Sequence, residues 1–375
     1  MFIRIALIAV IFSSTVYCSS DYYRGDSLVQ EGVYAFYNYD FDRAVSILSQ
    51  AREEYPDHPG VHLIWAASRW VKSQATNTVE ETYSILEKDL IEIQSIYEEL
   101  VLKYKYDPNY RLYQGSAIGL TARVSLGRKE WLKTLYRAYK GFTIIEDVSD
   151  NAPEIIDSML PIGIIEYYAG ISNVILKWAV KIYGLEASKE SGLEKIAIAA
   201  DRGQWSWIEA KAILCNLYLW VENDPLLSFE HSRDLVKHFP NNYYFNLLYF
   251  ESLIRTGKIT ESSLILEDMD IILSSLTNRQ REWYTPYQNY EKALSSFYKG
   301  DFTKTLSLLD QAINQYTGEL DIVLGNAYLL QGMVHDKLYR RNNARKSYNK
   351  CIELNNFSSA MNTAKKYLDH PYSGD

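Results

Sequence analysis

The chain has 375 residues, a formal net charge of −8 and 47% apolar residues. One compact core rarely grows to this length, so the chain either holds several domains or stacks repeats. Charged residues make up 23% of the chain, and this balance excludes a disordered polymer. The acidic excess argues against binding nucleic acid, because contacts to phosphates need a surplus of lysine and arginine.

Residues 1–20 predict a signal peptide for export. Arg4 supplies a positive charge, an apolar run follows it, and small polar residues end the segment. The apolar run is too short to span a bilayer. Two outcomes stay open at Cys18: cleavage nearby, which the bulky Tyr17 before it favours, and acylation as in a bacterial lipoprotein. We therefore expect a protein of the periplasm or cell envelope, with a lipid anchor at Cys18 as the alternative.

Residues 28–59 predict two helices joined by a short turn, the second of which ends before Pro56 because proline cannot extend a helix. Gly32 and Ala44 stand twelve residues apart, and Pro56 follows after twelve more. Small residues at this interval suit a helical hairpin whose backbones touch where the helices cross. The segment therefore predicts a helix–turn–helix unit.

The same spacing returns near the other end of the chain, with Gly332, Ala344 and Asn356. Three stretches between the two ends keep it less closely, each with a turn and a small residue at the expected crossing. The five units cover residues 28–59, 208–242, 242–269, 290–313 and 325–355.

This pattern resembles the tetratricopeptide repeat, a helix–turn–helix of about 34 residues with small residues at fixed places. The resemblance implies an all-α solenoid, in which antiparallel helix pairs stack into a superhelix. Residues 357–370 then look like the polar-faced capping helix that such stacks need.

The middle of the chain is less regular. Residues 79–107 predict one long amphipathic helix that ends before Pro108, and residues 111–148 predict a helix pair. We divide the chain into a signal peptide (1–20), N-terminal repeat-like helices (21–107), irregular helical hairpins (108–207) and a C-terminal array with its capping helix (208–375).

The stretch 160–184 is the most apolar one after the signal. A membrane span here would have to bury Glu166, Lys177 and Lys181, at roughly 2.5–3.5 kcal/mol for each charge near a bilayer centre. We therefore expect a buried helix hairpin that breaks near Gly170.

The order of helices from residue 160 to 266 resembles the middle region of the eukaryotic inclusion-body clearance family, whose helical tetratricopeptide members are linked to outer membranes and lipid bodies. An export signal is foreign to that family. The residues that carry the resemblance are Gly170, Asn173, Lys177, Gly192, Leu193 and Gly203.

Motifs of catalysis are missing from the sequence. No phosphate-binding loop, nucleophile elbow or dinucleotide fingerprint occurs. His58 and His62 are four apart, but a proline and a glycine between them place His58 in a loop, so we expect solvated or capping histidines. His231 and His238, seven apart on one helix, are the weaker alternative for a zinc site.

Other reactive side chains have ordinary explanations. Cys215 and Cys351 fall on apolar stripes of expected helices, where a free cysteine acts as a small hydrophobe. The basic cluster 339–346 reads as a charged turn, with an acidic partner as the alternative. We therefore expect a protein that is not an enzyme and needs no metal or cofactor.

In tetratricopeptide proteins the first helices of successive repeats line a concave face. Carrying the family's template positions over to this chain gives a groove that is aromatic and has few charges, unlike the grooves that grip acidic chaperone tails. About half of these rings have inter-repeat packing as an equal explanation. The candidate partner-binding residues are Phe36, Tyr37, Trp220, Tyr244, Arg255, Tyr287, Tyr290, Phe297, Tyr298, Asn326 and Lys337.

Two functions follow from this pattern. The first is a scaffold that binds a protein or peptide partner in the groove, because aromatic rings give contact area at a small entropic cost. The second is a carrier of lipid or another apolar ligand, which the stretch 160–184 and the clearance-family resemblance suggest.

Overall fold

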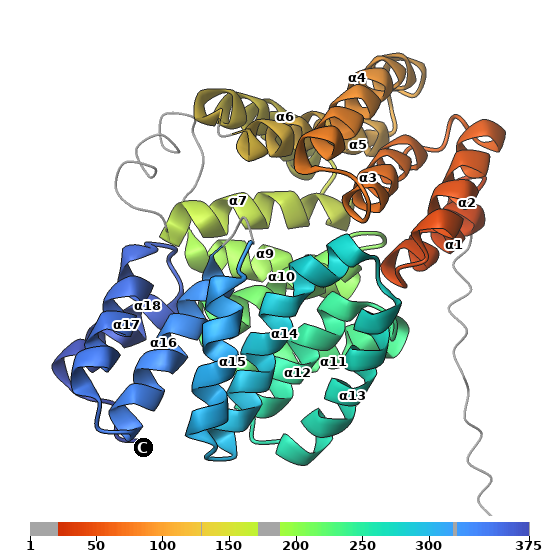
Figure 1. Cartoon of the computed structure of the whole chain (residues 1–375). Coiled ribbons are helices and arrows are strands. Elements are labelled where there is room, and N and C mark those ends of the chain that lie inside the picture. Colours follow the sequence, from red (N-terminus) through yellow and green to blue (C-terminus); the bar gives the residue numbers. More distant parts are fainter. Residues whose placement is uncertain (1–21, 129, 172–187, 318–320, 375) are drawn as a thin grey trace, which may run out of the picture.

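The computed structural model describes residues 22–128, 130–171, 188–317 and 321–374 (Figure 1). Within these ranges the chain forms helices and no strand. The signal peptide with Cys18, and Asn173, Lys177 and Lys181, lie outside the described residues. The helices are α1 (Asp26–Tyr37), α2 (Phe41–Glu54), α3 (Val61–Gln74), α4 (Val79–Lys103), α5 (Pro108–Gly127), α6 (Trp131–Asn151), a 3-10 turn (Ile156–Ser158), α7 (Met159–Ile171), α9 (Lys189–Arg202), α10 (Trp207–Trp220), α11 (Pro225–His238), α12 (Tyr243–Arg255), α13 (Ile259–Ser275), α14 (Asn278–Tyr298), α15 (Phe302–Asn314), α16 (Ile322–Lys337), α17 (Arg341–Glu353) and α18 (Ser359–Asp369).

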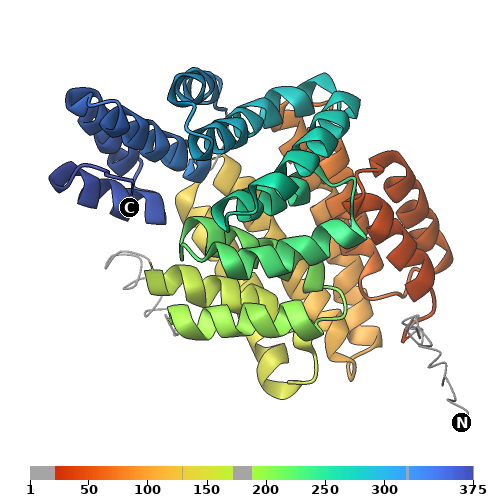
Figure 2. The ribbon, with the colours of Figure 1, turned by 90° about the horizontal axis from the view of Figure 1, so that it is seen from below.

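Helices that follow one another along the chain pack against each other as pairs, and short turns make the pairs antiparallel. In Figure 1 the helices α3 to α6 form an upper layer, the array α10 to α18 lies below it, and α7 and α9 lie between the two. Figure 2 shows α1 and α2 on the opposite side of the molecule from α16 to α18. The chain is therefore an all-α solenoid of stacked helix pairs, as the sequence predicted.

Five helix pairs are each joined by the same type of turn. A residue with a φ between 57° and 80° ends the turn, and five residues later a small side chain of the second helix is completely buried. The left-handed residue reverses the backbone, and the small side chain lets the first helix approach. This confirms the five predicted units. The positive-φ residues are Tyr39, Asn223, Gly257, Gly300 and Tyr339, and the buried small residues are Ala44, Ser228, Ser262, Thr305 and Ala344.

The close contact within the first and last pairs differs from the predicted one. The sequence suggested that two small residues face each other, but Gly32 lies against Leu48, where an added Cβ would stand 2.6 Å from the Cγ of the leucine. Gly332 lies in the same way against the ring of Tyr348. Each glycine therefore makes room for a large side chain sixteen residues later, because the helices interdigitate rather than touch backbone to backbone.

Side-chain caps begin the second helix in three of these pairs. Asp40, Asp224 and Asp301 each accept a hydrogen bond from the backbone N–H three residues later. The long helices α4 and α14 begin with capping boxes at Thr78 and Thr277. A capping side chain of this kind contributes about 1 kcal/mol to helix stability.

The irregular middle also agrees with the predicted elements. Helix α4 is the long helix, and α5 and α6 are the pair, which cross where Gly141 meets the backbone of Gly115 and Gly119. Helix α7 runs through Gly170 and ends at Ile171, and residues 172–187 of the predicted hairpin lie outside the described part of the chain.

Glu166 explains how a charge fits into the apolar stretch. It lies on α7 and is nearly buried, and Lys195 and Ser191 of α9 donate hydrogen bonds to its carboxylate across 2.8 and 2.9 Å. Helices α7 and α9 approach closely because Gly163 and Gly192 meet there. Among the helices that the structure describes, none combines the length and the apolar character that crossing a bilayer requires.

Candidate functional site

The inner helices of the C-terminal array surround a buried polar centre. Glu251 of α12 is completely buried, and the indole N–H of Trp220 on α10 donates to its Oε2 across 2.8 Å. Arg255 donates to Oε1 of the same carboxylate across 3.1 Å, and the hydroxyl of Tyr290 on α14 lies 3.4 Å from Oε1. Three successive first helices therefore meet at one carboxylate.

A second carboxyl group, that of Glu291 on α14, lies beside this centre and is also completely buried. Burial and the nearby carboxylate of Glu251 raise the pKa of Glu291 well above its usual value. Its surroundings therefore favour the protonated form of Glu291, while Arg255 pairs with Glu251.

These contacts correct part of the predicted groove. Trp220 is 4% exposed and Tyr290 is 3% exposed, so both pack inside the array and neither forms a wall open to a partner. The amide of Asn326 is likewise buried and donates to the carbonyl of Ile322. The reason is the tight curvature of the array, which brings α10, α12, α14 and α16 into contact.

The predicted residues nearest the N-terminus also contact the chain itself. The hydroxyl of Tyr37 donates to Glu209 across 2.8 Å, and Asn242 donates to the carbonyl of Tyr37. Phe36 packs edge-on against the ring of Tyr37, with 4.9 Å between ring centres. Tyr244 donates to Asn216 across 2.6 Å. The first helix pair therefore docks onto α10 and α12 at this end of the inner face.

The remaining predicted residues lie on α14 and α16, where more surface is exposed. Tyr298 is half exposed, and Phe297 packs against Tyr372 of the segment after α18, with 6.0 Å between ring centres. Lys337 donates to the carbonyl of Ser373 across 2.8 Å. Tyr287 packs against neighbouring tyrosines of α14 and of the segment after α15. Of the predicted residues, Phe297 and Lys337 thus already hold an extended segment.

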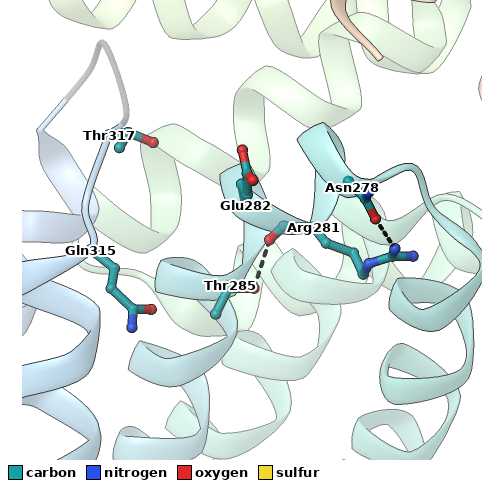
Figure 3. A pocket seen from close by; sticks show the side chains of 6 residues that line it. All are labelled: Asn278, Arg281, Glu282, Thr285, Gln315 and Thr317. Atoms are coloured by element: carbon teal, nitrogen blue, oxygen red, sulfur yellow. Dashed lines mark hydrogen bonds between the residues drawn. The ribbon is translucent and has the colours of Figure 1, made fainter. Parts of the chain in front are cut away.

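An open cavity of about 570 Å³ lies between the first half of α14 and the segment that follows α15 (Figure 3). Its volume is within the range of ordinary ligand sites. Its lining residues are Asn278, Arg281, Glu282, Thr285, Gln315 and Thr317.

Glu282 is the free charge of this cavity. The guanidinium of Arg281 is occupied, since it donates to the carbonyls of Ser274 and Leu276 and to the side chain of Asn278. The exposed carboxylate of Glu282 has no hydrogen bond or ion pair within the described ranges. The cavity therefore offers one carboxylate together with amide and hydroxyl groups.

Sequence reasoning missed this cavity because the stretch predicted for the fourth unit, residues 290–313, leaves out the first turns of its first helix. Helix α14 begins at Asn278, where Thr277 and Gln280 form the capping box. That box is visible in the sequence as a threonine followed three residues later by a glutamine. It was the signal that could have placed the cavity-lining turns on a helix.

The two histidines that the sequence predicted to be solvated or capping are buried. His58 is 3% exposed, accepts from the N–H of Gly60 at Nδ1 and donates from Nε2 to Asp26 across 2.7 Å. His62 accepts from Arg52 at Nδ1 and donates from Nε2 to the carbonyl of Pro56. Their loop and helix placement is confirmed, but both are internal hydrogen-bonding groups that join α1, α2 and α3.

The described part of the chain holds no cluster of side chains suited to metal binding or to thiol chemistry. No group of three His, Cys, Asp or Glu side chains there is placed to hold a metal ion. Cys215 and Cys351 are both free and buried, and burial raises the pKa of each thiol to about 12. In the basic cluster 339–346, Arg341 pairs with Asp336 and donates to two carbonyls at the end of α18.

No protein-family model matches the chain, and no curated protein matches it. Among solved structures, the chain is similar to a tetratricopeptide repeat protein from Parabacteroides merdae, with 10% identity and a TM-score of 0.31, over 92% of this chain and 97% of that one. It is also similar to yeast Tom70, with 11% identity and a TM-score of 0.36, over 92% of this chain and 90% of that one. Because both TM-scores are low, the repeat architecture rests on the helix pairs and turns described above.

Proposed function

We propose that this chain is a non-enzymatic scaffold of the cell envelope that binds a protein partner, and that a segment of the partner enters the cavity beside α14. The observation that carries this proposal is the unpaired carboxylate of Glu282 in an open, polar cavity. The described side chains around it form no nucleophile–base pair. Binding is the activity that this arrangement supports.

The chemistry of the cavity indicates which segment would bind. Gln315 and Thr317 are exposed and offer hydrogen bonds of the kind that a peptide backbone makes. Glu282 would pair with a lysine or arginine of the segment, and partial desolvation in the cavity would strengthen that pair. A short, extended, basic segment fits both features.

A photo-crosslinking amino acid at position 315 tests the binding site in cells that produce the protein. We expect a discrete adduct with one partner, which Glu282→Lys abolishes by reversing the charge. The same crosslinker at position 106, which is exposed in the turn between α4 and α5 and lies in neither proposed site, is the control. Equal adducts at both positions, or an adduct that persists in Glu282→Lys, would reject the cavity as the binding site.

The carrier of an apolar ligand is the competing function. The part of the stretch 160–184 that the structure describes packs α7 against α9. The cavity beside α14 is lined by amide, hydroxyl and charged side chains, which suit a peptide better than an acyl chain. Native mass spectrometry of the purified protein would detect a bound lipid, and a stoichiometric lipid would favour the carrier.

The place in the cell envelope is part of the same proposal. It is supported by the signal-like residues 1–20. Mass spectrometry of the mature N-terminus, taken from separate membrane and soluble fractions, measures whether Cys18 is acylated or removed. Finding the protein in the cytosol with residues 1–20 still attached would refute export.

A further inference from the structure

The segment after α18 folds back onto the C-terminal ends of α14 and α16. Residues 370–374 carry no helix and lie beside the lower end of α16, where Figure 1 marks the C-terminus. Tyr372 is the half-buried residue of this segment, and its neighbours on both sides are exposed. Tyr372 is therefore the side chain of the tail that packs most closely onto these helices.

The ring of Tyr372 lies in an aromatic slot. Phe297 of α14 packs against it with 6.0 Å between ring centres, and Tyr367 of α18 meets it edge-on at 5.3 Å. The ammonium group of Lys337 lies 5.9 Å from the centre of the same ring. Contacts between aromatic rings, and between a ring and an ammonium group, are attractive, so the slot favours an aromatic side chain.

Two charged side chains bind the backbone on either side of that ring. The carboxylate of Asp336 accepts from the N–H of Tyr372 across 3.0 Å, and Lys337 donates to the carbonyl of Ser373 across 2.8 Å. Because both contacts are made to backbone groups, they would hold a peptide of any sequence.

The receptor side of this site is fixed in place. Only 2% of the Asp336 side chain is exposed, and Arg341 and the hydroxyl of Tyr348 donate to it across 3.0 and 2.9 Å. A buried carboxylate held by two other donors needs no rearrangement to accept a backbone N–H. Asp336, Lys337, Phe297 and Tyr367 together form what we call the tail site.

We propose that the tail site is a peptide-binding site for an extended segment of a partner protein that presents an aromatic residue, and that the chain's own residues 370–374 occupy it until the partner displaces them. The tail shows the chemistry of the ligand, because it already places a ring, an N–H and a carbonyl on matching groups. A tethered segment competes at an effective concentration in the millimolar range. A partner therefore binds only when its segment outcompetes that tether.

This site is separate from the cavity beside α14, and its test needs no natural partner. Failure of either proposal therefore leaves the other standing. The probe is a fluorescent, amidated peptide with the sequence of residues 368–374, LDHPYSG. Fluorescence anisotropy measures its binding to the full chain.

The variant Tyr372→Ala empties the slot without touching the four residues of the tail site. We expect it to bind the peptide at least tenfold more tightly than the wild-type chain, in which the tail competes. A peptide with alanine in place of tyrosine should not bind, and adding Phe297→Ala or Lys337→Ala to Tyr372→Ala should weaken binding at least fivefold. Tyr339→Ala, at an exposed tyrosine in the turn between α16 and α17, is the matched control and should behave as wild type.

Three results would overturn the proposal. They are equal binding to Tyr372→Ala and wild type, equal binding of the tyrosine and alanine peptides, and no binding to Tyr372→Ala while circular dichroism shows that its helices are intact. Light scattering over a range of protein concentrations measures whether the chain forms dimers through this site. Dimers of the wild type that Tyr372→Ala abolishes would make a second copy, and not a partner protein, the occupant of the site.

Discussion

Gly332 of α16 lies against the ring of Tyr348 of α17, so a methyl group at position 332 would overlap that ring. The ring cannot move aside, because Tyr348 is completely buried and its hydroxyl donates to Asp336 across 2.9 Å. We therefore expect Gly332→Ala to lower the free energy of unfolding by about 1–3 kcal/mol. Urea unfolding followed by circular dichroism measures the loss.

Gly119 supplies the control for this substitution. It lies within α5, and nothing stands within 4 Å of a Cβ built on it. Gly119→Ala should stabilise the chain by about 0.5–1 kcal/mol, because alanine loses less entropy than glycine when a helix forms. Equal effects of the two substitutions would show that the ring of Tyr348 adapts.

The turns of the first and last helix pairs predict opposite effects of one substitution. Tyr39 and Tyr339 both have left-handed backbones, with φ of 64° and 57°, which costs a non-glycine residue roughly 1–2 kcal/mol. Tyr339 is 97% exposed, so Tyr339→Gly should raise the melting temperature by relieving this cost.

Tyr39→Gly should lower the melting temperature, because the ring of Tyr39 makes contacts within the fold that the exposed ring of Tyr339 does not make. Its hydroxyl lies 2.8 Å from that of Tyr284, and its ring packs against Phe41. Thermal unfolding of the two variants, side by side with wild type, measures both shifts. A rise for both would mean that the contact of Tyr39 with Tyr284 contributes nothing to stability.

The spacing of small residues predicted the helix pairs well, because the crossing of two neighbouring helices is a local matter. Ala44 and Ala344 are buried as expected, and the turns fall where the sequence placed them. The groove was less predictable, because whether Trp220 or Tyr290 faces solvent depends on how strongly the array curves. That curvature joins Trp220 to Glu251 across 31 residues, and no short sequence pattern encodes it.

The occupant of the tail site was also beyond prediction from the sequence. The template placed Phe297 and Lys337 in a binding groove, but the chain's own segment covers both. A segment of five residues without helix has no periodicity from which its position could be predicted. The role of Asp336 comes from three donors that meet only in the folded chain, so no sequence pattern shows it.

The hydrogen bond from the indole of Trp220 to Glu251 should contribute measurably to the stability of the folded chain. Trp220→Phe removes the N–H that donates to Glu251 and leaves a buried carboxylate short of one partner, at about 1–3 kcal/mol beyond the lost ring area. Trp70→Phe is the matched control, because the indole N–H of Trp70 is buried without a hydrogen-bond partner. Urea midpoints of the two variants should therefore differ, with Trp220→Phe the less stable. Equal midpoints would mean that the hydrogen bond to Glu251 adds no stability.

The second carboxyl of this centre makes stability depend on pH. The folded chain keeps Glu291 protonated because its pKa lies well above the usual value of 4.5, whereas the unfolded chain releases this proton above about pH 4.5. Between these two pKa values the folded state binds more protons than the unfolded state. The contribution of Glu291 is therefore fully present below pH 4.5 and declines as pH rises towards the folded pKa, by at most about 1.4 kcal/mol per pH unit.

Glu291→Gln removes this decline, because a glutamine side chain stays uncharged and keeps nearly the same shape. Its melting temperature should match that of the wild type near pH 4.5 and exceed it increasingly as the pH rises from there towards the folded pKa of Glu291. Thermal unfolding followed by circular dichroism in steps of half a pH unit measures the difference. A difference between Glu291→Gln and wild type that does not change with pH would mean that Glu291 is ionised in the folded chain, and that the buried centre carries two negative charges around Arg255.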